Sequence, residues 1–264
     1  MKKHFLLPAV LLLGFTTAVT SCKKKKDDDV NPTNPTPQAC TVDRARTNSD
    51  STQATYDSNN RIIKYQTFNN SGNSDNFILY TYNSNSIVQK NYDNNGDLTA
   101  ETDYYLNSNS NVSYSVHIED GDTDNADTTW YSYDGSNHNI RRATKNTSAV
   151  IGDLKNTTYD TTWYTYSGDN LSKIDKRNDN GDMETTIYSY GTADAKSKFL
   201  VPGQDAGILG LFGNTSAKLP VSATSGSTTR SYFYQFNQEG YVTRYQIVNS
   251  AVTEKDIRYT YNCK

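Results

Sequence analysis

The sequence predicts an all-β fold: a single large, strongly curved antiparallel meander, half-barrel or barrel-like, with one short helix in an insertion. Three observations predict it. A Tyr-x-Tyr unit recurs along the chain, clusters of Asn, Asp and Gly separate the units, and helical periodicity is nearly absent. Aromatic and β-branched residues favour strands, and Asn-Gly or Asp-Gly favours a tight hairpin. Consecutive hairpins without crossover helices give an antiparallel sheet.

The repeat also predicts the number of strands. Most copies follow one another at intervals of about 25 residues, which fits two strands and two turns per copy. The copies are anchored at Tyr56, Tyr82, Leu106, Tyr133, Tyr166, Tyr190, Phe236 and Tyr261. We therefore expect about 14–16 short strands, and a sheet of that size must curl, split or close. Alternate residues of a strand share a face, so both rings of a Tyr-x-Tyr unit point the same way.

Residues 1–21 predict an export signal. Lys2 and Lys3 form a basic start, and the apolar run over residues 5–19 is shorter than the roughly 20 residues of a membrane span. The residues just before Cys22 are small and resemble a lipobox. This resemblance implies cleavage before Cys22 and lipid on its sulfur, with two or more acyl chains for stable anchoring. The alternative is an uncleaved membrane anchor.

Residues 22–39 predict a solvated tether. Four lysines and three aspartates follow Cys22, and three prolines then stand among Asn, Thr and Gln. Such a segment is stiffened by proline and buries no core. The acidic stretch resembles the surface-export signal of Bacteroidota lipoproteins. We therefore expect a lipid-anchored protein of the bacterial outer membrane that is exposed at the cell surface; the alternative is its periplasmic face.

Residues 40–264 form the predicted repeat β domain, which an insertion over residues 191–225 interrupts. The insertion contains residues 206–212, the most apolar stretch of the mature chain. We interpret this stretch as a short helix or plug that covers one opening or the concave face of the sheet. The alternative is a loop that inserts into a partner, which would be an exposed apolar patch.

The Tyr-x-Tyr-Asp units resemble the YD repeats of Rhs-type shells, although their spacing is longer. A closer resemblance is to a Bacteroidota lipoprotein family of unknown function with a porin-like fold. It rests on Cys22, the Tyr-x-Tyr strands, and the blocks 210–213 and 216–221, and it covers roughly residues 40–264. The resemblance implies a strongly curved or barrel-like antiparallel sheet, and it implies no activity.

The chain has three cysteines. With Cys22 lipidated, Cys40 and Cys263 remain in an oxidising compartment, where disulfides persist. One opens the folded body and the other closes it, so a disulfide would join the first and last strands if the sheet brings them together. The alternative is two free thiols.

Candidate polar sites are few. Asp120, Asp122 and Asp124 alternate as in a calcium loop, but the residues at the positions of the turn glycine and the bidentate Glu do not match. An acidic hairpin loop is the favoured interpretation, and a calcium ion is the alternative. His117 and Glu119 share a strand face, which is short of the three or four ligands of zinc. The second histidine of the mature chain, His138, is expected to be solvated in a turn.

Two further sets of residues are candidates by type. Ser51, Thr128 and Thr161 stand in short motifs that resemble the O-glycosylation motif of Bacteroidota exported proteins. Trp130 and Trp163 are candidates for stacking on a ligand. We expect most tyrosines to form the core, because hydrophobic residues make up only 34% of the chain. If the tyrosines were exposed, they would stack on flat apolar ligands or sugar rings.

Charge and motif content bound the function. The mature chain carries 26 − 2 = 24 basic and 29 acidic residues, a net charge of −5, whereas nucleic-acid binding needs a basic face. No Ser-His-Asp or Cys-His signature is present in the sequence. We therefore expect a non-enzymatic envelope protein that binds a glycan or protein partner. The alternative is a hydrolase of surface glycan or polymer that uses convergent carboxylates.

Overall fold

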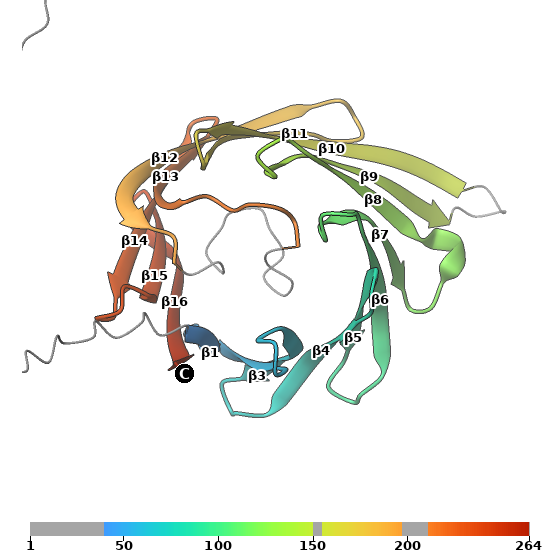
Figure 1. Cartoon of the computed structure of the whole chain (residues 1–264), viewed down its shortest axis with the longest axis horizontal. Coiled ribbons are helices and arrows are strands. Elements are labelled where there is room, and N and C mark those ends of the chain that lie inside the picture. The colour runs from blue at the N-terminus through green and yellow to red at the C-terminus, as the bar shows by residue number, and fades with distance from the viewer. Residues whose placement is uncertain (1–39, 150–154, 197–210, 264) are drawn as a thin grey trace, which may run out of the picture. The chain divides into compact units, whose positions relative to one another are not determined.

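The structure, a computed structural model, describes residues 40–149, 155–196 and 211–263. The predictions for the signal, the lipidated Cys22 and the tether lie outside the described residues. Within those ranges sixteen strands form one antiparallel barrel in which each strand pairs with its neighbours in sequence (Figure 1). The strands are β1 Cys40–Arg46, β2 Asp50–Tyr56, β3 Ile62–Asn69, β4 Ser74–Tyr82, β5 Ser86–Tyr92, β6 Leu98–Leu106, β7 Val112–Glu119, β8 Asp127–Tyr133, β9 Asn139–Ala149, β10 Lys155–Ser167, β11 Asn170–Arg177, β12 Met183–Asp194, β13 Lys218–Ser225, β14 Thr228–Phe236, β15 Val242–Asn249 and β16 Val252–Cys263.

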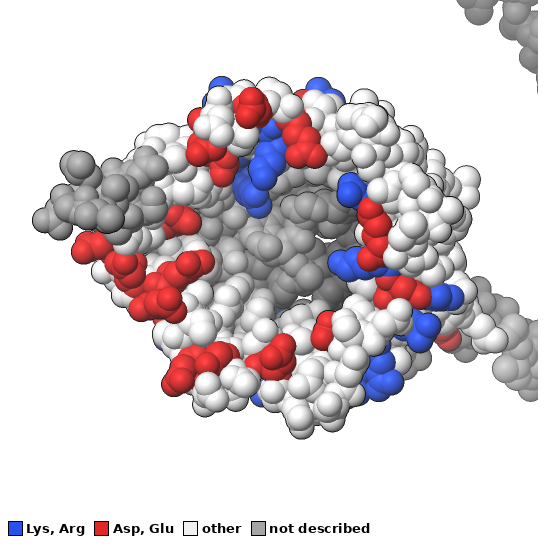
Figure 2. All heavy atoms as spheres, turned by 180° about the vertical axis from the view of Figure 1, so that it is seen from behind, with Lys and Arg blue, Asp and Glu red and all other residues white. Residues whose placement is uncertain are grey.

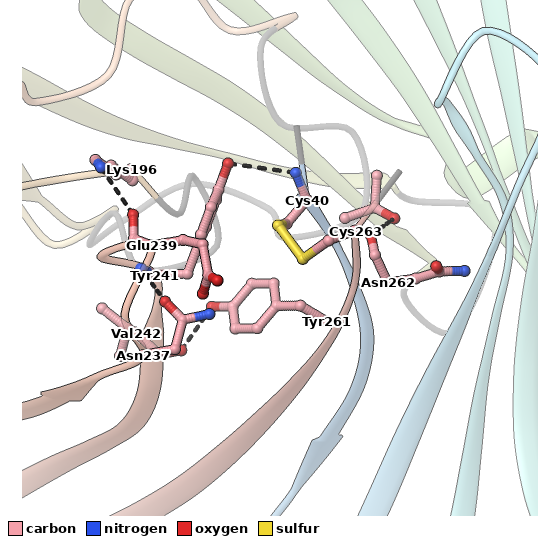
Figure 3. The surroundings of a disulfide bond; sticks show 10 residues. Cys40, Lys196, Asn237, Glu239, Tyr241, Val242, Tyr261, Asn262 and Cys263 are labelled. Carbon is pink, nitrogen blue, oxygen red and sulfur yellow. Dashed lines mark hydrogen bonds between the residues drawn. A yellow bond between two sulfur atoms is a disulfide. The ribbon is translucent and has the colours of Figure 1, made fainter. Parts of the chain in front are cut away.

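The barrel is closed by pairing between its first and last strands, so the predicted curved sheet is a full barrel and not a half-barrel. Cys40 lies opposite Cys263 in this ladder, and the two form a disulfide with a Cα–Cα distance of 4.1 Å (Figure 3). The predicted pairing is confirmed. Beside it, the Tyr241 hydroxyl accepts a hydrogen bond of 3.3 Å from the Cys40 amide. The disulfide and this hydrogen bond therefore both lie where the first and last strands close the barrel.

Asp and Asn side chains close the hairpin turns. Asp57 Oδ1 accepts hydrogen bonds of 2.9 Å from the amides of Asn59 and Arg61. The same two bonds, from the amides two and four residues later, recur at Asn69, Asp93, Asn107 and Asp134. Three residues after each of these Asx residues the backbone adopts a positive φ, at Asn60, Gly72, Gly96, Ser110 and Asn137. The clusters of Asn, Asp and Gly in the sequence therefore mark turns with one geometry.

Replacing Asp57 and Asp93 by Asn is expected to flatten the fall of stability in acid. Hydrogen bonds from the amides of Arg61 and Asp97 are the largest of the causes that hold the pKa of these two carboxyls below the usual 3.8. A carboxyl with a lowered folded pKa stabilises the fold above its unfolded pKa, and this contribution is lost as pH falls through the folded value. Asn keeps the acceptor oxygen and does not titrate. Melting temperatures of the unaltered chain and of the variant with both replacements, measured between about pH 5 and pH 2, test this. An equal fall in melting temperature for the two proteins would contradict it.

Buried tyrosine hydroxyls join neighbouring strands at one end of the barrel. Tyr82, at the end of β4, donates a 2.8 Å hydrogen bond to the carbonyl of Ile62 at the start of β3. Tyr133 at the end of β8 does the same to Val112 at the start of β7, at 2.7 Å. Four further pairs are Tyr56 with Val42, Tyr190 with Leu171, Tyr234 with Pro220, and Tyr261 with Val242. We call these bonds the tyrosine locks, and they explain why the repeat retains a tyrosine at this place.

Removal of a single lock is expected to lower the free energy of unfolding by about 1 kcal/mol, the net value of a hydrogen bond within a protein. Tyr82→Phe and Tyr133→Phe each remove one hydroxyl and keep the ring. The control is Tyr159→Phe, because Tyr159 is 59% exposed on the outer wall. Urea unfolding of the three variants measures the difference. A loss at Tyr159 as large as that at the locks would contradict a specific role for these bonds.

One face of the sheet lines the lumen and the other forms the outer wall. Cavity-lining side chains such as Tyr80, Gln89, Thr102 and Ser115 come from successive strands and define the inner face. Most tyrosines of the repeat belong to this face, and several are buried, including Tyr80, Tyr104 and Tyr259 at 4–9% exposure. The expectation that tyrosines build the core therefore holds for these buried rings, while others line open space in the lumen.

Residues 211–217 of the insertion cross the inside of the barrel at the end that carries the tyrosine locks (Figure 1). We call this segment the plug, and the end that it covers the plugged end. Phe212 is 3% exposed against Tyr104 and Tyr131, and the Leu211 carbonyl accepts a 2.7 Å hydrogen bond from the Val112 amide. This segment of the insertion lies across one end of the barrel, and the greater part of the stretch predicted to cover an opening, residues 206–210, lies outside the described residues.

The helix predicted over residues 206–212 is not found where it can be checked. Leu211 and Phe212 are not helical, and the rest of that stretch lies outside the described residues. The helical element in the described ranges is a single 3-10 turn, η1 Thr123–Asn125, in the β7–β8 loop. Hydrogen bonds from the plug to the neighbouring turns replace those of a helix. No helix in the described part of the chain has the length and apolar character to cross a membrane.

Candidate ligand-binding lumen

The lumen holds a cavity of about 460 Å³ lined from seven successive strands, β3 to β9. Its lining combines four tyrosines and one isoleucine with eight polar or charged side chains. The lining residues are Tyr65, Ile78, Tyr80, Gln89, Thr102, Tyr104, Ser115, His117, Asp127, Thr129, Tyr131, Arg142 and Thr144. Pockets for small molecules in proteins range over about 300–1,000 Å³, so this cavity is large enough for a ligand.

Hydrogen bonds between strands hold the polar part of this lining. Thr102 Oγ1 lies 2.8 Å from Nδ1 of His117, and the hydroxyls of Thr129 and Thr144 lie 3.0 Å apart. Asp127 Oδ1 accepts a 2.8 Å hydrogen bond from the amide of Thr147. Each of these groups has further donors or acceptors to offer, because a hydroxyl and a carboxylate take part in more than one bond. The cavity therefore presents fixed polar groups beside aromatic faces.

A second cavity of about 350 Å³ lies on the other side of Tyr65, against β1, β2, β3, β15 and β16. Tyr245 and Tyr259 line it together with Asp43 and Lys255. Burial is the largest of the causes that raise the pKa of both of these tyrosine hydroxyls, so they remain protonated at neutral pH. Because Tyr65 lines both cavities, the two spaces adjoin along one tyrosine-rich wall of the lumen.

Gly213 explains why the plug block of the sequence contains glycine. Its φ is +82°, and a Cβ at this position would lie 2.3 Å from the carbonyl oxygen of Asn137 and 3.0 Å from the ring of Tyr133. A side chain is therefore excluded both by backbone conformation and by space. The next residue, Asn214, donates its amide to the same Asn137 carbonyl at 2.7 Å. The plug can seat against the β8–β9 turn only with glycine here.

The sequence predicts a solvated His138, but the structure buries this side chain. It is 4% exposed, its ring stacks on Tyr166 with centroids 4.3 Å apart, and Nδ1 lies 3.2 Å from Asp134. Bridges to Gly213 and Asn214 of the plug cover it. The expectation of a solvated turn was wrong because the covering segment lies about 75 residues further along the chain. His138 helps to seat the plug and does not face the cavity lining described above.

At the end opposite the plug, carboxylate side chains lie around the rim of the barrel, with Lys and Arg side chains between some of them (Figure 2). The loops that follow odd-numbered strands lie at this end, since strands of an antiparallel meander alternate in direction. Their carboxylates include Asp93, Asp97, Asp120, Asp122, Asp124, Asp179 and Asp182. We call this end the acidic mouth.

Charged side chains occupy the outer wall of the barrel in the middle of strands. Lys90 of β5 pairs with Glu101 of β6 at 3.1 Å, and Lys173 pairs with Asp175 on β11 at 2.6 Å. The register places these side chains on the face opposite to the cavity lining. Such pairs on the surface of a protein contribute little to stability, and they place charge in the middle of the outer wall.

The structure does not gather the predicted metal ligands. Asp122 Oδ1 accepts a 3.0 Å hydrogen bond from the amide of Asp124 and caps the 3-10 turn, while Asp120 has a positive φ of 49°. Nowhere in the described ranges do three His, Cys, Asp or Glu side chains form a group that could hold a metal ion. The three aspartates form part of the acidic mouth. His117 and Glu119 lie 3.6 Å apart without a third ligand.

The other candidate residues lie away from the cavity. Trp130 is 44% exposed on the outer wall, and Trp163 lies on the same wall with the Arg177 guanidinium 5.5 Å from its ring centroid. Thr161 is 4% exposed, whereas Ser51 and Thr128 are half-buried within strands. The residues that line the cavity, above all Arg142, were not singled out from the sequence. These lining residues can be identified from the alternation of inward and outward side chains along each strand, once the register of the strands is known.

Two solved structures resemble this barrel. A porin-like protein from Bacteroides uniformis ATCC 8492 matches with a TM-score of 0.60 at 14% identity, over 84% of this chain and 98% of that chain. A porin-like protein from Bacteroides vulgatus ATCC 8482 matches with a TM-score of 0.57 at 13% identity, over the same shares. No family model and no curated protein matches the chain. The two TM-scores establish a shared porin-like β fold. At identities this low, the resemblances to the lipoprotein family and to Rhs-type repeats stay unconfirmed.

Proposed function

We propose that this chain is an exported, lipid-anchored, non-enzymatic binding protein whose lumen takes a sugar-ring ligand through the acidic mouth. The observation that carries the proposal is the cavity of about 460 Å³ with four tyrosines and a set of fixed polar groups. Sugar rings have apolar faces that stack on aromatic rings and hydroxyls that need hydrogen-bond partners. A lining of tyrosine, Gln, Ser and Thr offers both.

Two features favour a binding cup over a membrane channel. The outer wall carries ion pairs in mid-strand, whereas a barrel that spans lipid presents an apolar band about 25 Å tall. The plug also crosses one end with buried Phe212, and in this proposal a ligand enters through the acidic mouth. In this proposal lipid on Cys22 holds the barrel at the membrane, and the strands stay in water.

Binding accounts for the cavity better than hydrolysis does. Glycoside hydrolysis uses two carboxyl groups on either side of the scissile bond. Asp127 is the one carboxylate among the described residues that line the larger cavity, and it holds the Thr147 amide. The polar groups of this lining are those of a recognition site.

The proposal is tested by measuring binding of the full chain to a panel of neutral and acidic mono- to tetrasaccharides, using calorimetry for the members that bind. Saturable one-to-one binding of at least one short saccharide is expected. Bound saccharides should be released from the chain without any cleavage, which chromatography of the recovered ligand measures. A panel without a binder, or recovery of cleaved sugar, would overturn the proposal.

A further inference from the structure

The larger cavity contains one cationic side chain among its described lining residues, Arg142. Arg142 lies on β9 between Tyr131 of β8 and Thr162 of β10, and the register turns it into the lumen. Its neighbour Arg141 is exposed and points to the outer wall opposite Ser132 and Trp163. Two adjacent arginines of the sequence thus face opposite sides of the barrel.

Arg142 has no acceptor of its own. It is half-buried, and among the residues that the structure describes its guanidinium forms neither an ion pair nor a hydrogen bond. Two other arginines of the barrel are paired: Arg61 lies 2.7 Å from Asp57, and Arg244 lies 2.6 Å from Asp256. A guanidinium that is unpaired among the described residues and lines the cavity has five N–H donors to be satisfied by water or by a ligand.

We infer that the lumen binds a short saccharide that carries a single carboxylate, with the carboxylate on Arg142. This inference rests on the proposed function and names its ligand class. A guanidinium binds a carboxylate through two parallel hydrogen bonds, and such charge-assisted bonds are stronger than neutral ones. The ring of Tyr131 and the hydroxyl of Thr144 line the same cavity beside Arg142, so one sugar can engage all three.

The acidic mouth sets the limit on charge. A ligand with many carboxylates meets repulsion from the aspartates of the open-end loops, whereas a single carboxylate is screened over about 8 Å at physiological ionic strength. The cavity volume of about 460 Å³ also suits a short molecule and not a polymer chain. Uronic acids and sialic acids at the end of a short saccharide have this chemistry.

The test compares acids with their own neutral forms on the unaltered full chain. Digalacturonate that is free at one carboxyl is titrated against its full methyl ester, and sialyllactose is titrated against its own methyl ester. We expect at least one acid to bind about ten times more tightly than its neutral match. Equal affinity within both pairs, or tighter binding of the neutral forms, would overturn the inference and leave sugar binding itself intact. Absence of binding to all four would overturn the inference, and absence of binding across the whole saccharide panel would overturn the proposed function.

Arg142 is then tested by Arg142→Gln, with Arg141→Gln on the outer wall as the matched control. We expect Arg142→Gln to lose the preference for the acid, measured as the ratio of its affinities for the acid and for the neutral match, and Arg141→Gln to keep that preference. Arg142→Lys keeps the charge and loses the planar fork, so an intermediate preference is expected. An acid preference that survives in Arg142→Gln would overturn the assignment of this residue.

Discussion

A chain in which Cys40 and Cys263 are both replaced by alanine is expected to lose about 4–5 kcal/mol of unfolding free energy. The disulfide spans a sequence separation of 223 residues, so it removes a very long loop from the freedom of the unfolded chain. The native barrel stays closed in this variant, because β1 and β16 also pair along their length. The effect is therefore expected in the free energy of unfolding and not in the fold.

Equilibrium unfolding in urea measures this loss, and circular dichroism of the aromatic region checks that the native barrel is retained. The unaltered chain in a reducing buffer serves as the control, and its unfolding midpoint should fall to that of the double variant. A double variant within about 1 kcal/mol of the oxidised chain would show that the strand ladder alone closes the barrel.

The second large effect is expected from Phe212→Ala, which should lower the unfolding free energy by about 3–5 kcal/mol. Phe212 is 3% exposed and contacts the rings of Tyr104 and Tyr131, so its removal leaves a cavity beneath the plug. The control is Phe233→Ala, because Phe233 is 54% exposed on the outer wall. Urea unfolding compares the two variants, and equal losses would contradict a structural role for the plug.

The spacing of the repeat predicts much of the fold, because strands and hairpin turns depend on residues that are close together in the sequence. Eight copies correspond to eight even-numbered strands, and tyrosines such as Tyr82 and Tyr133 stand at strand ends where their hydroxyls reach the preceding strand. The disulfide followed from one cysteine at each end of the repeat. Closure of the sheet could not be predicted, because the register of β1 against β16 depends on the curvature summed over all the strands.

The site could not be predicted for a related reason. Arg141 and Arg142 are indistinguishable in the sequence, and only the register with Tyr131 sends one of them into the lumen. The indole side chains of Trp130 and Trp163 drew attention by type, yet both lie on the outer wall. Residues that line the cavity are gathered from seven strands, so no local pattern marks them. The acidic loop at residues 119–127 was correctly interpreted as a hairpin loop, because its carboxylates form turn hydrogen bonds.

The central claim is that a ligand occupies the lumen, and one pair of variants tests it most directly. Thr129 lines the cavity, and Thr128 on the same strand faces the outer wall. Thr129→Trp fills part of the lumen, whereas Thr128→Trp changes only the outer wall. Both variants are titrated by calorimetry with the saccharide that the unaltered chain binds most tightly. The account predicts that Thr129→Trp loses at least about tenfold in affinity while Thr128→Trp binds as the unaltered chain does. Unchanged binding by a folded Thr129→Trp, or loss confined to Thr128→Trp, would contradict a binding site in the lumen.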